Sequence, residues 1–554
     1  MTRKKQQAGR PLHQLCIDEV LTTAGVDAGE IDLLALGRSR LPADCFIKSY
    51  RPSRAVVRRL LRRPLHLYTE IREQRQADEF EIVNAACLCR HIGMRHDAKA
   101  RFVNHHYSHV LGAFKFTTWE NDALYIACDA GGDGTSYAAY YFDGSRLHRI
   151  YGGDEYILQK KFNAAASIGI AYSHVTKGLG FRASRHEGKI TGLAAFGKPV
   201  VADQIYEQFV LHPDFSIESR LADNKALKDF LYGLIAKHSR EDMAASIQEA
   251  TERFILKWVR QLLAKYPVSR IGLSGGVFAN VRLNQKISEI EGIDEVFVFP
   301  AMGDEGLSVG NCVAEEIREL GLAGVKRYKL DHVYLGYPYP AGSLLDEADA
   351  SGFYVVQNEQ PAAQTAGLLA RNYIGAIFSR RMEMGPRALG ARSIIASPAR
   401  RELNDTLNKR LNRTEFMPFA PYVCDTDADE VFVMTAANRE ACRFMTITTD
   451  VKQHYQEMIQ AVVHVDGTAR PQIIERDTNA LYYDILQEFK ALTGIPCLVN
   501  TSFNAHEEPI INKPAEALKS LQEQRIDFLV TECGLVFRSE ADYRQACSGS
   551  GRNG

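Results

Sequence analysis

Short apolar runs followed by glycine-rich loops recur along the chain and predict buried strands with loops at their ends. Residues 124–128 are apolar throughout and lead into Asp-Ala-Gly-Gly-Asp-Gly at 129–134. Residues 270–274 run into a Gly-Gly turn and the start of a predicted helix, and residues 296–300 predict another buried strand. This alternation indicates an α/β fold, which keeps its ligands at the carboxyl ends of its strands.

Other segments complete the expected secondary structure. Residues 137–141 and 147–151 predict a hairpin around Asp143-Gly144, because this dipeptide suits a tight turn. Residues 33–36 predict a short buried strand, and residues 245–266 predict a helix.

Residues 51–64 combine apolar residues and arginines at helical spacing. On a helix, the apolar positions 56, 57, 60 and 61 would lie on one side and the arginines at 58, 59, 62 and 63 on the other. One interpretation is a helix that contacts a membrane surface or an acidic lipid. The other, which the usual amphipathic pattern favours, is a helix that packs on the core and exposes a basic back to solvent.

Composition and charge narrow the class of protein. The chain has 554 residues, of which 45% are hydrophobic and 24% charged, and this predicts a globular protein of two or more domains. A net charge of −1 gives no overall field that would favour nucleic acid. The sequence shows no bilayer-length apolar run, no signal peptide and no zinc spacing among its 11 cysteines, so we expect a reduced, cytoplasmic protein.

Two histidines and two aspartates form the first candidate site. His105 and His109 are four residues apart, so on a helix both imidazoles leave the same face. Asp129 ends the first apolar run, and Asp304 follows the last strand expected above. Two imidazoles and a carboxylate beside a glycine loop suggest a metal ion that meets a nucleotide. The structural alternative is one capping histidine, one core histidine and a tight hairpin.

The second glycine loop has the form of a nucleotide-binding turn. Gly275 and Gly276 lie between a predicted strand and a helix that begins near Asn280, and this geometry directs backbone N–H groups toward a phosphate or ribose. The two strand-and-loop units are typical of the facing halves of a two-lobed nucleotide fold. Glu187 and Lys189 lie where a loop would enter a helix, which places them near a ligand; a surface ion pair is the alternative.

Glycines and prolines between 321 and 342 predict a domain boundary. It would divide the chain into residues 1–340 and 341–545, with a disordered tail at 546–554. The second domain carries arginines beside Gly-Pro and Gly-Ala kinks, of which Arg387 is one. Rigid turns suit arginines that act as fixed bidentate clamps on phosphate, whereas arginines on a flexible solvated face would not need them.

Several runs have the form of known family motifs. They are Met-Glu-Met-Gly-Pro-Arg-Ala-Leu-Gly at 382–390, Thr-Glu-Phe-Met-Pro-Phe-Ala-Pro at 414–421, Asn-Thr-Ser-Phe-Asn at 500–504, His-His-x-x-His at 105–109, Ser-Gly-Gly-Val at 274–277 and Glu-Gly-Lys at 187–189. In their order along the chain these motifs resemble those of the O-carbamoyltransferases of nodulation and antibiotic biosynthesis, and the resemblance covers nearly the whole chain. The resemblance implies an actin- or sugar-kinase-like (ASKHA) two-lobed N-terminal domain and a YrdC-like α/β C-terminal domain.

The resemblance also implies an ATP-dependent carbamoyltransferase. The C-terminal domain would join carbamoyl phosphate and ATP into carbamoyl adenylate, and the N-terminal domain would pass the carbamoyl group to an acceptor hydroxyl. Two imidazoles with carboxylate and phosphate oxygens suit divalent iron or a neighbouring first-row ion, and ATP would bring Mg²⁺.

Site residues follow from the same resemblance. The positions that would hold the metal ion are His105, His109, Asp129 (which is also open to contact with the adenylate) and Asp304. The positions that would contact the nucleotide are Glu187, Lys189, Gly275, Gly276 and Asn280. The positions that would bind anions in the second domain are Arg387, Arg413, Arg470, Asn500 and Ser502.

One departure from the family pattern concerns the start of the chain. Family members open with a strand–turn–strand that carries a His-Asp step, for which roughly twenty to thirty residues would be needed. Residues 2–5 resemble the basic segment that follows it, so we expect Lys4 to contact the intermediate. The missing histidine would be the general base for the acceptor.

Three functions therefore remain open. The favoured acceptor is the sugar of a nodulation-factor lipo-chitooligosaccharide, because residues 51–64 could contact lipid. The alternatives are O-carbamoylation of an antibiotic or other secondary metabolite, and an N-terminally truncated, catalytically impaired binding protein. The expected partners are carbamoyl phosphate, ATP and a hydroxylated acceptor, without nucleic acid; weak contact with a lipid surface and a homodimer are compatible with the sequence.

Overall fold

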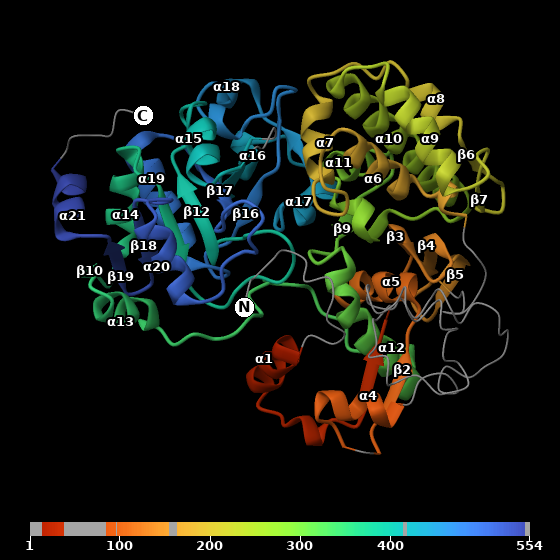
Figure 1. Cartoon of the computed structure of the whole chain (residues 1–554), viewed down its shortest axis with the longest axis horizontal. Coiled ribbons are helices and arrows are strands. Elements are labelled where there is room, and N and C mark those ends of the chain that lie inside the picture. The colour runs from red at the N-terminus through yellow and green to blue at the C-terminus, as the bar shows by residue number, and fades with distance from the viewer. Residues whose placement is uncertain (1–13, 38–84, 96, 154–162, 414–417, 549–554) are drawn as a thin grey trace, which may run out of the picture.

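A computed structural model describes residues 14–37, 85–95, 97–153, 163–413 and 418–548 of the chain (Figure 1). Two mixed sheets dominate these residues, one of five strands and one of eight. In Figure 1 the eight-stranded sheet lies beside the helices that cover the five-stranded sheet. The α/β class expected from the sequence is confirmed. Lys4, the basic segment 51–64 and residues 414–417 fall outside the described ranges.

The five-stranded sheet has the order β5-β4-β3-β8-β9. Its strands are β3 (Ala123–Gly132), β4 (Thr135–Phe142), β5 (Leu147–Tyr151), β8 (Arg270–Ser274) and β9 (Glu295–Val298). The first three form antiparallel hairpins, and β8 and β9 continue the sheet parallel to β3. The hairpin and the three buried strands predicted from the sequence are thereby confirmed.

Both faces of β3 are buried from Ala123 to Cys128, which explains why these six residues are apolar throughout. Leu124 and Ile126 belong to one hydrophobic cluster, whereas Tyr125 and Ala127 belong to another on the opposite face. The helices on the first face include α6 (Ile168–Gly178) and α10 (Arg240–Lys265). The helices on the second face are α5 (His105–Lys115) and α12 (Leu307–Leu320). Further helices around this sheet are α7 (Glu187–Ala194), α8 (Ala202–Tyr206), α9 (Asn224–Ile235) and α11 (Val281–Ser288), and β6 (Phe209–Leu211) pairs with β7 (Ile217–Ser219).

The two glycine loops leave one sheet, so the prediction that they form facing halves is wrong. β3 and β8 are parallel neighbours with Ala127 opposite Ser274, and the loops that follow them therefore lie side by side. This pairing could not be predicted from the order of the strands, because more than one hundred residues separate β3 from β8 in the sequence. A separate parallel pair, β1 (Leu33–Leu36) and β2 (Lys99–Phe102), contacts α12 and α4 (Ala85–Ile92) and confirms the strand at 33–36. The two-lobed N-terminal domain that the family resemblance implies remains an expectation.

The eight-stranded sheet has the order β10-β19-β18-β11-β12-β17-β13-β16. Its strands are β10 (Tyr354–Gln357), β11 (Gly375–Phe378), β12 (Arg392–Ala396), β13 (Ala420–Cys424), β16 (Gln472–Ile474), β17 (Cys497–Ser502), β18 (Phe528–Thr531) and β19 (Gly534–Phe537). The helices of this part of the chain are α13 (Ser343–Ala350), α14 (Pro361–Ala370), α15 (Leu403–Arg410), α16 (Ala428–Val431), α17 (Ala436–Cys442), α18 (Gln453–Gln456), α19 (Ala480–Thr493), α20 (Pro514–Gln522) and α21 (Glu540–Cys547). A short ladder joins β14 (Thr449–Asp450) to β15 (Thr468–Ala469). Helix α21 continues to Cys547 and buries Ala546, so the tail does not begin at 546 as predicted.

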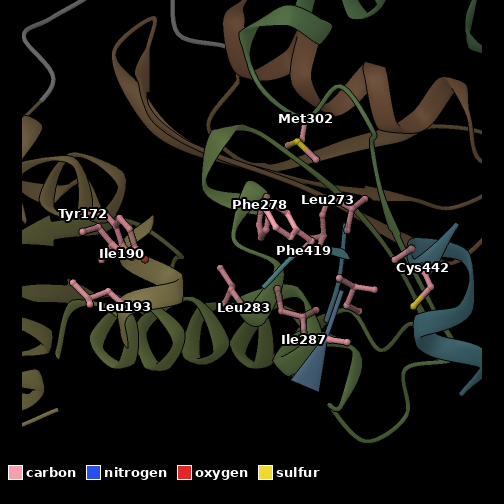
Figure 2. Close-up of a cluster of buried hydrophobic side chains, with 14 of the residues drawn as sticks. Tyr172, Ile190, Leu193, Leu273, Phe278, Leu283, Ile287, Met302, Phe419 and Cys442 are labelled. Atoms are coloured by element: carbon pink, nitrogen blue, oxygen red, sulfur yellow. The ribbon is translucent and has the colours of Figure 1, made fainter. Parts of the chain in front are cut away.

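One hydrophobic cluster runs from the five-stranded sheet into the C-terminal part of the chain. Figure 2 shows Phe278, Leu283 and Ile287 near Phe419 and Cys442. The buried amide of Asn284 crosses the same junction, since its Nδ2 donates to the carbonyl of Thr446 at 2.7 Å. The two parts of the chain are therefore packed against each other through a common core. In the part of the chain that the structure describes, no helix has the length and apolar character needed to cross a membrane.

Candidate metal centre and anion-binding cleft

Helix α5 places two histidines at the edge of the five-stranded sheet. Its N-cap is Asn104, whose Oδ1 accepts hydrogen bonds from the backbone N–H groups of His106 and Tyr107 at 2.9 and 3.0 Å. The helix begins at His105, so His109 lies one turn later on the same face. Both imidazoles are buried, with ring centroids 4.7 Å apart.

Two carboxylates face these rings. Asp129 lies in β3, and Asp304 begins the 3₁₀ turn η7 (Asp304–Gly306) that follows β9. His105 Nε2 lies 3.1 Å from Asp129 Oδ2 and 3.6 Å from Asp304 Oδ1. His109 Nε2 lies 3.8 Å from each of the same two oxygens. The Asp304 side chain is 64% exposed and that of Asp129 17%, so the group opens to solvent on the Asp304 side.

These four residues, which we call the metal centre, fit a divalent ion. Donor atoms that share an ion at bonds of about 2.1 Å lie about 3.0 to 3.4 Å from one another, close to the spacings seen here. The buried Nε2 of His109 has no hydrogen-bond partner among the described residues, and a ligand bond would satisfy it. Two imidazoles and two carboxylates are a donor set that first-row divalent ions accept.

The imidazoles and carboxylates of the metal centre shift one another's pKa values. Burial lowers the pKa of His109, but the carboxylates of Asp129 and Asp304 outweigh this effect and raise that pKa to about 9. Burial likewise raises the pKa of Asp129, yet His105 and His109 lower it well below its usual range. Because a metal ligand must be a neutral imidazole, an ion that binds here displaces a proton.

The loop after β3 fixes the start of α5. Asp133 accepts a hydrogen bond of 2.6 Å from the backbone N–H of His105 through its Oδ2. Gly132 lies directly against His105, and a Cβ at this glycine would come within 2.3 Å of the imidazole ring. A glycine is therefore required for the close approach of loop and ring.

The loop after β8 is pressed against β3 in a similar way. Gly275 has φ of 96°, and its N–H donates to the carbonyl of Met302 at 2.7 Å. A Cβ on Gly276 would lie 2.9 Å from Asp129 Oδ1. Gly276 also begins the 3₁₀ turn η6 (Gly276–Ala279), so this turn starts at the metal centre.

Asn280 caps the helix that follows η6. Its Oδ1 accepts from the backbone N–H of Leu283 at 3.1 Å, which makes it the N-cap of α11. Its Nδ2 donates to Gln248 Oε1 at 2.8 Å. The side chain predicted to face a nucleoside is thus bonded within the protein.

A cleft lies between the N-terminal and C-terminal parts of the chain, and the space within it, including the solvent at its open mouth, is about 1090 Å³. Its N-terminal wall includes residues of α7 and the end of η6, and its C-terminal wall includes residues 386–387, 418–420 and 501–502. The arginine and lysine residues that line it are Arg185, Lys189, Arg387, Arg413 and Arg470. Such a concentration of fixed positive charge suits a polyanion.

Arg413 is held rigidly at the end of β17. Its guanidinium donates to Thr501 Oγ1 at 3.0 Å and to the carbonyl and hydroxyl of Ser502 at 2.8 and 3.0 Å. It also donates to the carbonyl and the side-chain oxygen of Asn504 at 2.7 and 2.6 Å. These bonds fix the position of the positive charge, as a bidentate clamp on phosphate requires.

The residues predicted to bind ligands divide into two groups. The cleft brings together Lys189, Arg387, Arg413, Arg470 and Ser502. Two others use their side chains inside the protein. Asn500 is buried and donates to the carbonyl of Ala388 and to Gln472, while Glu187 accepts from the hydroxyl of Ser173 and the N–H of Ser184.

Sequence reasoning missed a charged group at the rim of the cleft. Glu507 Oε2 accepts hydrogen bonds from Arg182 and from Arg185, the latter at 2.5 Å, and Oε1 lies 2.9 Å from His186 Nε2. Burial raises the pKa of Glu507, but His186 and the two arginines together lower it below its usual range. The available signal was the run Arg-Ala-Ser-Arg-His directly before Glu187.

Comparison with protein families places this geometry in a known class. The carbamoyltransferase N-terminus family matches residues 76–313, which contain the metal centre, and the carbamoyltransferase C-terminus family matches residues 366–538, which contain the cleft arginines Arg387, Arg413 and Arg470. An α/β enzyme that transfers carbamoyl groups is the class that these matches define. The chain belongs to the carbamoyltransferase family, as the motifs in its sequence indicated.

Curated relatives extend the similarity along the chain. Nodulation protein NolNO of Sinorhizobium fredii is 29% identical over 545 residues, which are 95% of this chain and 74% of the relative. Nodulation protein NolO of Bradyrhizobium diazoefficiens is 31% identical over 453 residues, or 79% of each protein. An uncharacterised protein of Methanocaldococcus jannaschii is 32% identical over 452 residues, which are 79% of this chain and 83% of that protein.

Solved structures are similar only over parts of the chain. Full-length HypF in its phosphate- and nucleotide-bound form matches with a TM-score of 0.24 and 18% identity, over 41% of this chain and 46% of HypF. A glucokinase of the ROK family from Streptomyces griseus, in complex with glucose and AMPPNP, matches with a TM-score of 0.22 and 13% identity, over 39% of this chain and 67% of the kinase. Matches at this level do not establish a common fold, and the sugar-kinase-like and YrdC-like architectures stay predictions.

Proposed function

We propose that this carbamoyltransferase makes carbamoyl adenylate from ATP and carbamoyl phosphate in the cleft and transfers the carbamoyl group to an acceptor hydroxyl at the metal centre. The main support for the proposal is that the 3₁₀ turn η6 connects the metal centre to the cleft. Gly276 at its start lies against Asp129 of the metal centre, and Ala279 at its end lines the cleft. At a rise of about 2.0 Å per residue, roughly 6 Å of backbone separates the two sites. An intermediate made in the cleft would have a short path to the metal centre.

The first step would use the positive charge of the cleft. Carbamoyl phosphate loses phosphate to water, and an oxygen of the resulting carbamate attacks the α-phosphorus of ATP. The α–β anhydride bond breaks, so the products are carbamoyl adenylate, pyrophosphate and phosphate. Arg387, Arg413 and Arg470 would offset the charge of the reacting phosphates, and the fixed guanidinium of Arg413 supports this role because it needs no reorganisation.

The second step would take place beside α5. The acceptor hydroxyl attacks the carbamoyl carbon, its proton passes to a base, and AMP leaves. A divalent ion held by the metal centre, for which we propose iron, would supply Lewis-acid polarisation of a phosphate or carbamoyl oxygen. Asn104 and Asp133 would keep His105 and His109 oriented, because both residues bond the first turn of α5. Lys4 is proposed to contact the intermediate.

We also propose a nodulation-factor lipo-chitooligosaccharide as the acceptor. The support is that two relatives aligned over most of their length are named nodulation proteins. The test is to incubate the enzyme, ATP and carbamoyl phosphate with either a lipo-chitooligosaccharide or an aminoglycoside. A mass increase on the lipo-chitooligosaccharide alone is the expected result. Carbamoylation of the aminoglycoside alone would instead establish the antibiotic alternative.

Two variants test whether the cleft and the metal centre carry out separate steps. Wild-type enzyme with ATP, carbamoyl phosphate and a divalent ion should release pyrophosphate and, with acceptor, AMP. Arg413→Gln should abolish pyrophosphate release, whereas His109→Ala should retain it and lose carbamoyl transfer. Arg439→Gln, at a partly exposed ion pair with Asp429, is the matched control for the first variant. Loss of pyrophosphate release in His109→Ala as complete as in Arg413→Gln would contradict two separate sites.

A further inference from the structure

Glu507 is enclosed by cations that come from the N-terminal part of the chain. Arg182 and Arg185 both donate to its Oε2, and His186 Nε2 lies 2.9 Å from its Oε1. The neighbouring His506 brings a second imidazole, whose Nε2 lies 3.8 Å from the same Oε1. One carboxylate thus faces two guanidiniums and two imidazoles.

The charge of Glu507 is opposite to that of its surroundings. Among the described residues that line the cleft, Glu507 alone carries a carboxylate, whereas the lining arginines and lysines are Arg185, Lys189, Arg387, Arg413 and Arg470. A carboxylate in a cleft for phosphates repels the ligand at short range. Its presence is therefore unfavourable for binding unless it moves when the ligand arrives.

The backbone of Glu507 supports such a movement. Its φ of 65° lies in the left-handed region, which costs free energy for a residue with a side chain. The ion pairs with Arg182 and Arg185 offset this cost in the conformation described here.

We propose that Arg182, Arg185 and His186 form an anion subsite that receives a phosphate group of the nucleotide or of pyrophosphate, and that Glu507 fills this subsite as an internal counter-ion until the phosphate displaces it. The inference rests on the proposed function, and it adds to the C-terminal arginines of the cleft a subsite from the N-terminal part of the chain.

The donors of this subsite match a phosphate group. Two guanidiniums and an imidazole already converge on the two oxygens of one carboxylate, and a phosphate presents oxygens of similar spacing with more charge. His186 is also the N-cap residue of α7, so the positive end of that helix faces the same place. Because the ligand must replace a carboxylate, the subsite would discriminate in favour of polyphosphates over singly charged anions.

The test is a calorimetric titration of the full chain with inorganic pyrophosphate at fixed ionic strength. Glu507→Gln keeps the shape of the side chain and removes the competing charge, so pyrophosphate should bind roughly tenfold more tightly than to wild type. Glu508→Gln removes the same charge from the next residue, which pairs with Arg525, and should leave the affinity unchanged. The double variant Arg185→Gln/Glu507→Gln should lose the gain, because a donor of the subsite is absent.

The outcomes separate this inference from the proposed function. If Glu507 were a structural brace between the two parts of the chain, Glu507→Gln would bind pyrophosphate as wild type does or more weakly, and the subsite would be refuted. The proposed function would stand in that case if Arg413→Gln still abolished binding. Absence of pyrophosphate binding to wild type and Glu507→Gln alike would overturn both.

Discussion

The carboxylate of Asp133 accepts a 2.6 Å hydrogen bond from the backbone N–H of His105. This bond joins the loop after β3 to the first residue of α5, which is also a residue of the metal centre. The negative charge of Asp133 lies at the N-terminus of the helix, where it is electrostatically favourable. The loop after β3 therefore determines where the helix begins and how its first imidazole is oriented.

Removal of this support should weaken metal binding without unfolding the protein. Asp133→Ala is expected to lower the affinity for a divalent ion by about tenfold or more, as for other residues that orient metal ligands. Asp133→Asn keeps an acceptor and tolerates the φ of 47°, so it should restore part of the affinity. Competition with a chromogenic chelator measures both variants. Equal affinity in wild type and Asp133→Ala would show that the bond does not orient His105.

The contact between Gly276 and Asp129 leads to a second prediction. A Cβ at Gly276 would lie 2.9 Å from Asp129 Oδ1, so Gly276→Ala should displace that carboxylate. Carbamoyl transfer is expected to fall by about tenfold or more, since small displacements of reacting groups are costly. Pyrophosphate release in the cleft should change much less. Gly233→Ala is the control, because its Cβ would meet no atom within 4 Å in α9, and it should stabilise the fold by about 0.5–1 kcal/mol.

The third prediction concerns the pH dependence of stability. Burial raises the pKa of Glu252, and the hydrogen bond that Gln248 donates to it at 2.6 Å opposes this only in part. A carboxyl whose pKa is higher in the folded state stabilises the fold below its unfolded pKa and loses this contribution as the pH rises through the folded pKa. Glu252→Gln keeps the acceptor without the charge. Its Tm should exceed that of wild type near neutral pH and match it near about pH 4. A Tm difference that is the same at both pH values would contradict the assignment.

Arg413 gives the fourth prediction. Arg413→Lys supplies a single ammonium group in place of a guanidinium that bonds Thr501, Ser502 and Asn504. We expect pyrophosphate affinity to fall by about ten- to a hundredfold and the free energy of unfolding to fall by about 2 kcal/mol. Calorimetry and urea unfolding measure the two effects. Arg544→Lys, at an exposed pair with Glu540 on α21, should change neither quantity. Unchanged pyrophosphate affinity in Arg413→Lys would remove Arg413 from the set of anion-binding residues.

Features set by neighbouring residues could be predicted from the sequence. The apolar run of β3, the hairpin of β4 and β5 and the i,i+4 pair His105 and His109 each depend on local spacing, and the structure contains all three. Asp304 could be added because it follows a recognisable strand. All four side chains of the metal centre therefore meet for two reasons. The histidines are one turn apart on one helix, and Asp129 lies in β3 and Asp304 follows β9, which are parallel in one sheet.

Features that depend on distant pairing could not be predicted in the same way. The pairing of β3 with β8 decides whether the two glycine loops face each other or lie side by side. The sequence of neither strand indicates which strand it pairs with. Arg182 and Glu507 are 325 residues apart, so nothing local indicates that they form an ion pair. Asn280 and Asn500 lie in recognisable motifs, but only the structure shows that their side chains bond within the protein.

The core that Leu283 and Phe419 share has a consequence for how this enzyme can be divided. A cut in the connection near residue 340 would leave each fragment with a large apolar face exposed to water, and fragments of that kind aggregate. We therefore expect that the two steps proposed for this enzyme cannot be expressed or exchanged as independent modules. A chimera with a new acceptor specificity would have to carry the matching C-terminal half along with the N-terminal one.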